Sequence, residues 1–146
     1  MLKSALIGAV ALTLAGCATV DVANYRSELP PLDLAQYFNG TVDGWGMFQD
    51  RSGKVVRRFT VRIDAKWDGN RGTGTAGDVV GTGQGIQQGN AFNMRYVLRV
   101  PWAGRTIDVD MDDWMWRIDD QTVLNRTAMT KFGFRVGEVT LSLRKR

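Results

Sequence analysis

Hydrophobic and polar residues alternate along most of the chain after residue 44. Successive side chains of a β-strand point to opposite faces, so a period of two is typical of strands with one buried and one wet face. One run places five apolar residues on a single face: Phe59, Val61, Ile63, Ala65 and Trp67. A second run repeats the pattern with Phe92, Met94, Tyr96, Leu98 and Val100.

Turn-forming residues separate these runs at short intervals. They lie at positions 51–53, 68–70, 103–104, 119–121 and 131–133. This spacing predicts about seven to nine short strands joined by hairpins and no long helix. We therefore predict an all-β domain, either an antiparallel up-and-down barrel or a strongly curved sheet.

A short helix is expected just before the first strand. Asp33 is a good N-cap, and Leu34, Tyr37 and Phe38 share one apolar face. We predict a single helical turn over residues 33–38 that plugs one end of the barrel.

The alternation changes parity at two places, and each change predicts a β-bulge. Ile107, Val109 and Met111 occupy odd positions, but Trp114 and Trp116 occupy even ones, which predicts an extra residue near Asp112 and Asp113. The second change falls at Gly137 and Glu138. Local kinks of this kind help a sheet to curl.

The N-terminus has the pattern of a secretory signal. Lys3 precedes an uninterrupted run of apolar, small residues from Ala5 to Ala15, and Leu14-Ala15-Gly16-Cys17 resembles the lipobox of bacterial lipoproteins. The run is shorter than the roughly 20 residues that a transmembrane helix needs. We predict a signal peptide over 1–16, a lipidated Cys17 with a tether over 17–32, and a single domain over 33–146. That lipobox resemblance implies acyl chains (such as palmitate) on the cysteine and, because Ala18 is not Asp, an outer-membrane location on the periplasmic side.

Charge and glycine content exclude some classes of function. The chain carries 19 Lys and Arg against 15 Asp and Glu, a net charge of +4. The two signs alternate along the strands, so the chain lacks the basic stripe of a nucleic-acid binder. The glycine-rich segment 69–89 has no Gly-Lys-Ser or Gly-Lys-Thr ending, so it predicts thin strands or a flexible connection rather than a nucleotide site.

Few residues are available for catalysis or metal binding. The sequence has no His, and its single cysteine is the expected lipidation site. Asp112, Asp113 and Glu138 are weak catalytic candidates, since two carboxylates about 5–9 Å apart can cleave a glycosidic bond. The alternative is structural: Asp112 and Asp113 begin a turn, and Glu138 pairs with Arg126 or Arg135. Alternate acidic residues on a strand do not wrap an ion, so we expect no metal and no cofactor.

Large side chains on the alternating faces are candidates for lining a ligand cavity. They are Trp45, Phe59, Trp67, Phe92, Met94, Tyr96, Trp114, Trp116 and Phe134. Small barrels either fill with such side chains or leave room for one small ligand. A solid packed core is the alternative interpretation.

Several short motifs together resemble a family of Gram-negative lipoproteins, domain of unknown function 3833. They include Leu32-Asp33-Leu34, Tyr37-Phe38-Asn39-Gly40, Gln49-Asp50-Arg51-Ser52-Gly53, Asp112-Asp113-Trp114-Met115, Asn125-Arg126 and Gly137-Glu138-Val139-Thr140-Leu141. The resemblance covers nearly all of the chain after Cys17. It implies an exported, lipidated, β-rich domain with a lipocalin-like fold and no established activity.

The chain departs from this family in one connection. Trp67-Asp68-Gly69 reaches Asp78-Val79-Val80 after eight residues, where the family has enough for about two more strands. The barrel is therefore expected to lack a hairpin and to be open along one side.

Three functions follow as expectations. The first is a non-enzymatic outer-membrane lipoprotein that binds an apolar or amphipathic, lipid-like ligand. The second is an envelope scaffold with a filled core and a protein partner of unknown identity. The third is a carboxylate-dependent cell-wall hydrolase.

Overall fold

The computed structural model describes residues 20–68, 71–72 and 79–146. The predicted signal peptide, Cys17 and most of the segment 69–78 lie outside the described residues. Two short helices precede the strands: η1 (Val22–Tyr25) and α1 (Leu34–Tyr37). The strands are β1 (Gly40–Asp50), β2 (Val55–Ala65), β3 (Trp67–Asp68), β4 (Arg71–Gly72), β5 (Val79–Gln88), β6 (Ala91–Trp102), β7 (Arg105–Arg117), β8 (Thr122–Lys131) and β9 (Phe134–Lys145).

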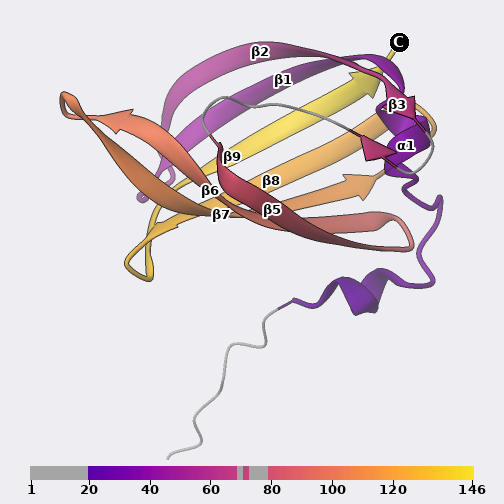
Figure 1. Cartoon of the computed structure of the whole chain (residues 1–146), viewed down its shortest axis with the longest axis horizontal. Coiled ribbons are helices and arrows are strands. Elements are labelled where there is room, and N and C mark those ends of the chain that lie inside the picture. The colour runs from indigo at the N-terminus through magenta and orange to yellow at the C-terminus, as the bar shows by residue number, and fades with distance from the viewer. Residues whose placement is uncertain (1–19, 69–70, 73–78) are drawn as a thin grey trace, which may run out of the picture.

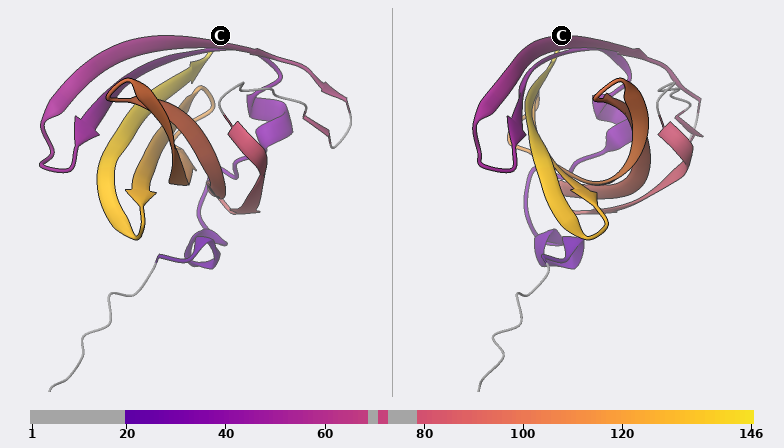
Figure 2. Two further views of the ribbon diagram at one scale, coloured as in Figure 1. Left: turned by 60° about the vertical axis from the view of Figure 1, so that its left-hand side comes forward. Right: turned by 90° about the vertical axis from the view of Figure 1, so that its left-hand side faces the viewer.

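Seven strands form one antiparallel sheet in the order β2-β1-β9-β8-β7-β6-β5 (Figure 1). Strands β5 to β9 follow one another as a meander, and the β1–β2 hairpin adds to its end by pairing β1 with β9. The sheet curls strongly, as the two turned views show (Figure 2). The all-β, up-and-down prediction is confirmed, and of its two forms the structure adopts the curved sheet.

The sheet is open between its edge strands β2 and β5. The connection between them holds only the two-residue strands β3 and β4 among its described residues, and these pair with each other rather than with the sheet. A pair this short cannot supply the backbone partners that would join the two edges. The open side expected from the short connection is confirmed.

One end of the concave face is filled by the predicted helical plug. Asp33 caps α1 by accepting a hydrogen bond from Gln36 N at 2.9 Å. Tyr37 is buried, and its hydroxyl donates to the backbone oxygens of Gln121 at 2.9 Å and Leu143 at 3.0 Å. The cluster around it contains Leu32, Tyr37, Val42, Val123 and Leu143.

A second apolar cluster fills the other end of the concave face. Its buried members are Val109, Met111 and Met129, with Phe48 and Val139 among the partly buried side chains packed against them. These residues come from β1 and β6 to β9, which the alternation of the sequence placed on one face.

Close packing of phenylalanine rings over glycines accompanies the curvature. A Cβ at Gly85 would lie 2.4 Å from the ring of Phe92, and one at Gly137 would lie 2.5 Å from the ring of Phe48. Glycine is needed at both positions because any side chain would displace the ring. Rings that cover glycines in this way are a known device of curved sheets.

One of the two predicted bulges is absent. Strand β7 pairs with β6 and β8 in unbroken register, so Asp113 continues the inward series of Val109 and Met111. Trp114 and Trp116 therefore lie on the outer face. They are accommodated there because Tyr25 of η1 packs on both rings, with centroid distances of 6.0 and 6.2 Å.

The second predicted bulge is present. In the pairing of β8 with β9, Met129 lies opposite Gly137, but the next residue, Thr130, lies opposite Arg135. Val136 is therefore the extra residue of the bulge. The bulge lies one residue before the predicted position.

The described part of the predicted tether, residues 20–32, contacts the sheet. Within its described part, Val22 and Leu32 are buried, Leu32 N donates to the backbone oxygen of Gly89, and Arg117 donates to the backbone oxygen of Pro31. This part of the predicted tether thus packs against the sheet. Its packing depends on partners more than 50 residues away, which local composition does not reveal.

Candidate functional site

A buried polar cluster lies between the two apolar clusters of the concave face. Its centre is Asp113 of β7, which is 7% exposed. Thr127 faces it directly from β8, and Asn125 is two residues along the same strand. Tyr96 reaches it from β6 on the other side. Strands β6, β7 and β8 thus bring four polar side chains together at the middle of an apolar surface.

Hydrogen bonds hold the carboxylate of Asp113 in place. Asn125 Nδ2 donates to Asp113 Oδ1 and, at 3.0 Å, to the backbone oxygen of Trp114. The Tyr96 hydroxyl donates to Asp113 Oδ2 at 3.2 Å. Both carboxylate oxygens have donors, as a buried carboxylate requires.

Burial controls the acidity of this cluster. It raises the pKa of Asp113 to about 6, although the hydrogen bonds from Asn125, Tyr96 and Thr127 act in the opposite direction. Burial also raises the pKa of Tyr96, and the neighbouring charge of Asp113 adds to this effect. The site therefore presents a hydrogen-bond acceptor that gains its charge close to neutral pH.

Apolar side chains that are only half-buried flank this cluster. They are the inward residues of the strands at or near the open edges: Phe59, Val61 and Ile63 of β2, and Phe92, Met94, Leu98 and Val100 of β6. In the middle of the sheet, by contrast, Val42, Val109, Val123 and Leu143 are almost fully buried. Val61, Ile63 and Phe92 pack against the first apolar cluster, and Leu98 and Val100 pack against the second. They stay partly exposed because β2 and β5, the edge strands beside them, do not pair with each other. We call this half-buried surface the trough.

The nine predicted lining residues lie in different parts of the structure. Phe59, Phe92, Met94 and Tyr96 lie on the concave face, as expected. The other predicted residues of the sheet lie elsewhere: Trp45, Trp114 and Trp116 are on the outer face, and Phe134 is 76% exposed beside the β8–β9 turn. Trp67 lies in β3, outside the seven-stranded sheet.

The three candidate catalytic carboxylates lie on two different faces of the sheet. Asp113 is on the concave face, whereas Asp112 and Glu138 are on the outer face. Asp112 and Glu138 lie on the two strands that flank Ala128, so their backbones are about 9–10 Å apart. Asp112 lies 3.6 Å from Arg95. Glu138 accepts from Arg126 at 2.7 Å and also pairs with Arg135. The geometry matches the structural interpretation of Glu138, which pairs with both arginines named for it.

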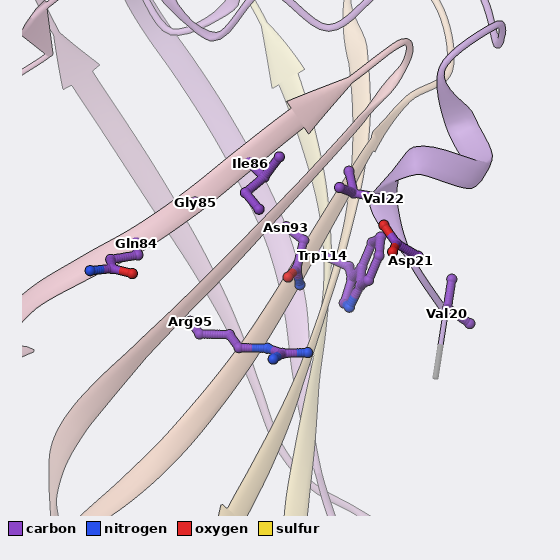
Figure 3. A pocket seen from close by; sticks show the side chains of 9 residues that line it. All are labelled: Val20, Asp21, Val22, Gln84, Gly85, Ile86, Asn93, Arg95 and Trp114. Atoms are coloured by element: carbon purple, nitrogen blue, oxygen red, sulfur yellow. The ribbon is translucent and has the colours of Figure 1, made fainter. Parts of the chain in front are cut away.

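A hollow lies on the outer face, between η1 and strands β5 to β7 (Figure 3). Its volume is about 710 Å³. Val20 and Asp21 border it on one side, Ile86 and Arg95 on the other, and the indole of Trp114 forms part of its wall. We call it the η1 pocket.

Sequence analysis missed the polar partners of Asp113. Asn125 and Thr127 occupy the same parity as Val123 and Met129, so polar residues on a predicted inner face were the available signal. The η1 pocket left no comparable signal, because it depends on a segment that was assigned to the tether.

Two negative observations concern the described part of the chain. None of its helices is long and apolar enough to cross a membrane. No three of its acidic or other metal-ligating side chains gather in a way that would hold a metal ion.

Fold and site together define an open, curved, up-and-down β-sheet protein with a polar centre in its concave face. The chain belongs to the family described as a protein of unknown function, DUF3833, whose matches cover residues 11–73 and 70–145. The two matched segments overlap at residues 70–73, which lie between β2 and β5 in the sequence. Comparison with curated proteins and with solved structures gives no significant match.

Proposed function

We propose that this protein is a non-enzymatic lipoprotein, anchored through Cys17 on the periplasmic side of the outer membrane, that binds a lipid-like molecule in the trough. The ligand is apolar or amphipathic: its hydrocarbon part covers the half-buried side chains, and a polar group reaches the Asp113 cluster. This function and location rest on the lipobox, on the resemblance to lipocalin-like lipoproteins and on the form of the concave face.

The half-buried state of the trough carries the proposal. Apolar surface gains about 25 cal/mol for each Å² removed from water, so these side chains favour an occupant. The trough resembles typical ligand sites in combining apolar walls with a few convergent polar groups. The raised pKa of Asp113 supports an amphipathic ligand, since the acid can donate a hydrogen bond when protonated and accept one when ionised.

A scaffold function is the second candidate, and one observation favours it. Both ends of the concave face are filled by side chains of the chain itself, including Leu32, Val109, Val123 and Leu143. If the trough takes no ligand, the function resides on the outer surface. The hydrolase function is the third candidate; Asp112 and Glu138 share the outer face, but each lies beside an arginine, as structural carboxylates do.

Native mass spectrometry tests the proposal. The mature chain is purified from cells in mild detergent, and any adduct is extracted and identified. We expect a fatty acid or phospholipid at near-stoichiometric level, either as purified or after incubation with a lipid panel. A bare mass in both cases contradicts the ligand and leaves the scaffold.

A matched pair of variants on β2 localises the ligand. Val61→Lys places a charge in the trough, and Thr60→Lys places the same charge one residue away on the outer face. We expect the adduct to fall at least tenfold with Val61→Lys and to persist with Thr60→Lys, with circular dichroism showing that both fold. Equal loss in the two variants would contradict binding in the trough.

A further inference from the structure

The η1 pocket lies close to the point where the described chain begins. Val20, which lines it, is three residues after Cys17. Three residues span at most about 10 Å. Because η1 is packed on the sheet through Tyr25 and the buried Val22, the domain cannot swing on a long linker. If Cys17 carries the anchor of the proposed function, on which this inference rests, the η1 pocket lies within about 10 Å of the bilayer surface.

The outer face around the pocket is rich in exposed apolar side chains. Ile86 is 61% exposed and Val20 is 55% exposed. Four residues on neighbouring strands lie opposite one another in a row, in the order Trp116, Leu124, Ser142 and Trp45. Leu124 and Trp45 of this row are exposed. Tryptophan and aliphatic side chains with nearby arginines are typical of surfaces that rest at the membrane–water interface.

The pocket carries one charge of each sign. Arg95 lines one side, and its ion pair with Asp112 is long, at 3.6 Å between Nε and Oδ1. Asp21 lines the other side and uses one oxygen to cap η1. A zwitterionic phospholipid headgroup has the complementary arrangement, because its phosphate suits the guanidinium and its amine suits the carboxylate.

We propose that the η1 pocket binds the headgroup of a bilayer phospholipid, so that the outer face of β5 to β8 lies against the membrane. The phosphate lies at Arg95, and Ile86, Leu124 and Val20 enter the interface. This orientation turns the trough away from the bilayer surface.

Fluorophore accessibility tests the docked face. The lipidated mature protein is reconstituted in phosphatidylethanolamine/phosphatidylglycerol vesicles, and one cysteine is introduced and labelled with an environment-sensitive fluorophore. Acylation blocks Cys17, so the new thiol is unique. We expect labels at Leu124→Cys and Ile86→Cys to shift to the blue and to resist an aqueous quencher several-fold, and a label at Phe132→Cys, on the β8–β9 turn, to remain quenchable. Shielding of Phe132→Cys alone, or of no site, overturns the proposal.

A second pair of variants tests the headgroup. Arg95→Gln removes the charge at the pocket, whereas Arg99→Gln removes a similar charge from the same face of β6, where Arg99 pairs with Asp108 at 2.7 Å. Vesicles of digalactosyldiacylglycerol, which has no phosphate, give the level of shielding without a phosphate headgroup. We expect Arg95→Gln, but not Arg99→Gln, to lower the shielding of the label at Ile86→Cys to that level. Equal effects of the two variants, or equal shielding in both kinds of vesicle, overturn headgroup binding.

The mass of the N-terminal peptide shows whether Cys17 carries lipid. It therefore distinguishes a failure of this proposal from a failure of the proposed function. A lipidated chain with a quenchable Leu124→Cys label overturns the docked face and leaves the anchor and the trough ligand intact. A chain without lipid overturns the anchor and the docked face together.

Discussion

Asp113 is the residue whose environment departs most from that of an ordinary aspartate. Its carboxyl group is buried on the concave face and receives hydrogen bonds from Asn125 and Tyr96. Two neutral donors offset part of the cost of removing the charge from water, and burial still raises the pKa to about 6. Above that pH, the buried charge of Asp113 therefore lowers the free energy of unfolding.

This cost predicts an unusual dependence of stability on pH. The folded state binds the proton of Asp113 more tightly than the unfolded state does, so the free energy of unfolding falls as the pH rises from about 4 to about 6. The fall due to Asp113 is about 2–3 kcal/mol and is complete above pH 6. We expect Asp113→Asn to remove this component, as measured by urea denaturation between pH 4 and pH 7. Asp112→Asn, on the outer face, is the control and should keep it; parallel curves for Asp113→Asn and the wild type would contradict the assignment.

At the scale of elements, ring-over-glycine packing accompanies the curvature of the sheet. Gly85 and Phe92 form a cross-strand contact in which the ring occupies the space of a side chain. We expect Gly85→Ala to lower the free energy of unfolding by about 1–3 kcal/mol, because the new Cβ meets the ring. Combining it with Phe92→Leu should recover at least part of this loss, so the double variant is more stable than the sum of the two single effects predicts. Strict additivity in chemical denaturation would show that the contact does not determine the packing.

The docking of η1 is a second property of elements. Tyr25 packs on Trp114 and Trp116, whose rings stack at 5.7 Å. We expect Tyr25→Ala to increase amide hydrogen exchange over residues 20–31 at least tenfold while β7 stays protected, because the segment loses its aromatic contact. Tyr25→Phe keeps the ring and should leave exchange unchanged. Loss of protection throughout the sheet would instead indicate that η1 stabilises the whole domain.

At the scale of the whole molecule, the two faces of the sheet have different characters. The concave face combines packed ends, an open trough and a polar centre, and the outer face combines exposed apolar side chains, arginines and the η1 pocket. Under the two proposals, the outer face rests on the bilayer and the trough opens toward the periplasm. A lipid-like ligand would then enter from the side opposite the membrane, between β2 and β5.

The sequence by itself determined the features that depend on neighbouring residues. The alternation in β2 and β6, the turns, the cap of α1 by Asp33 and the bulge near Gly137 follow from local stereochemistry. The short connection after Trp67 also predicted the open side. Only the tertiary structure decided which face Trp114 and Trp116 occupy, because their cover is Tyr25, about 90 residues earlier in the chain. The burial of Asp113 was decided in the same way, since its partners come from two other strands and no local pattern specifies how strands meet in space.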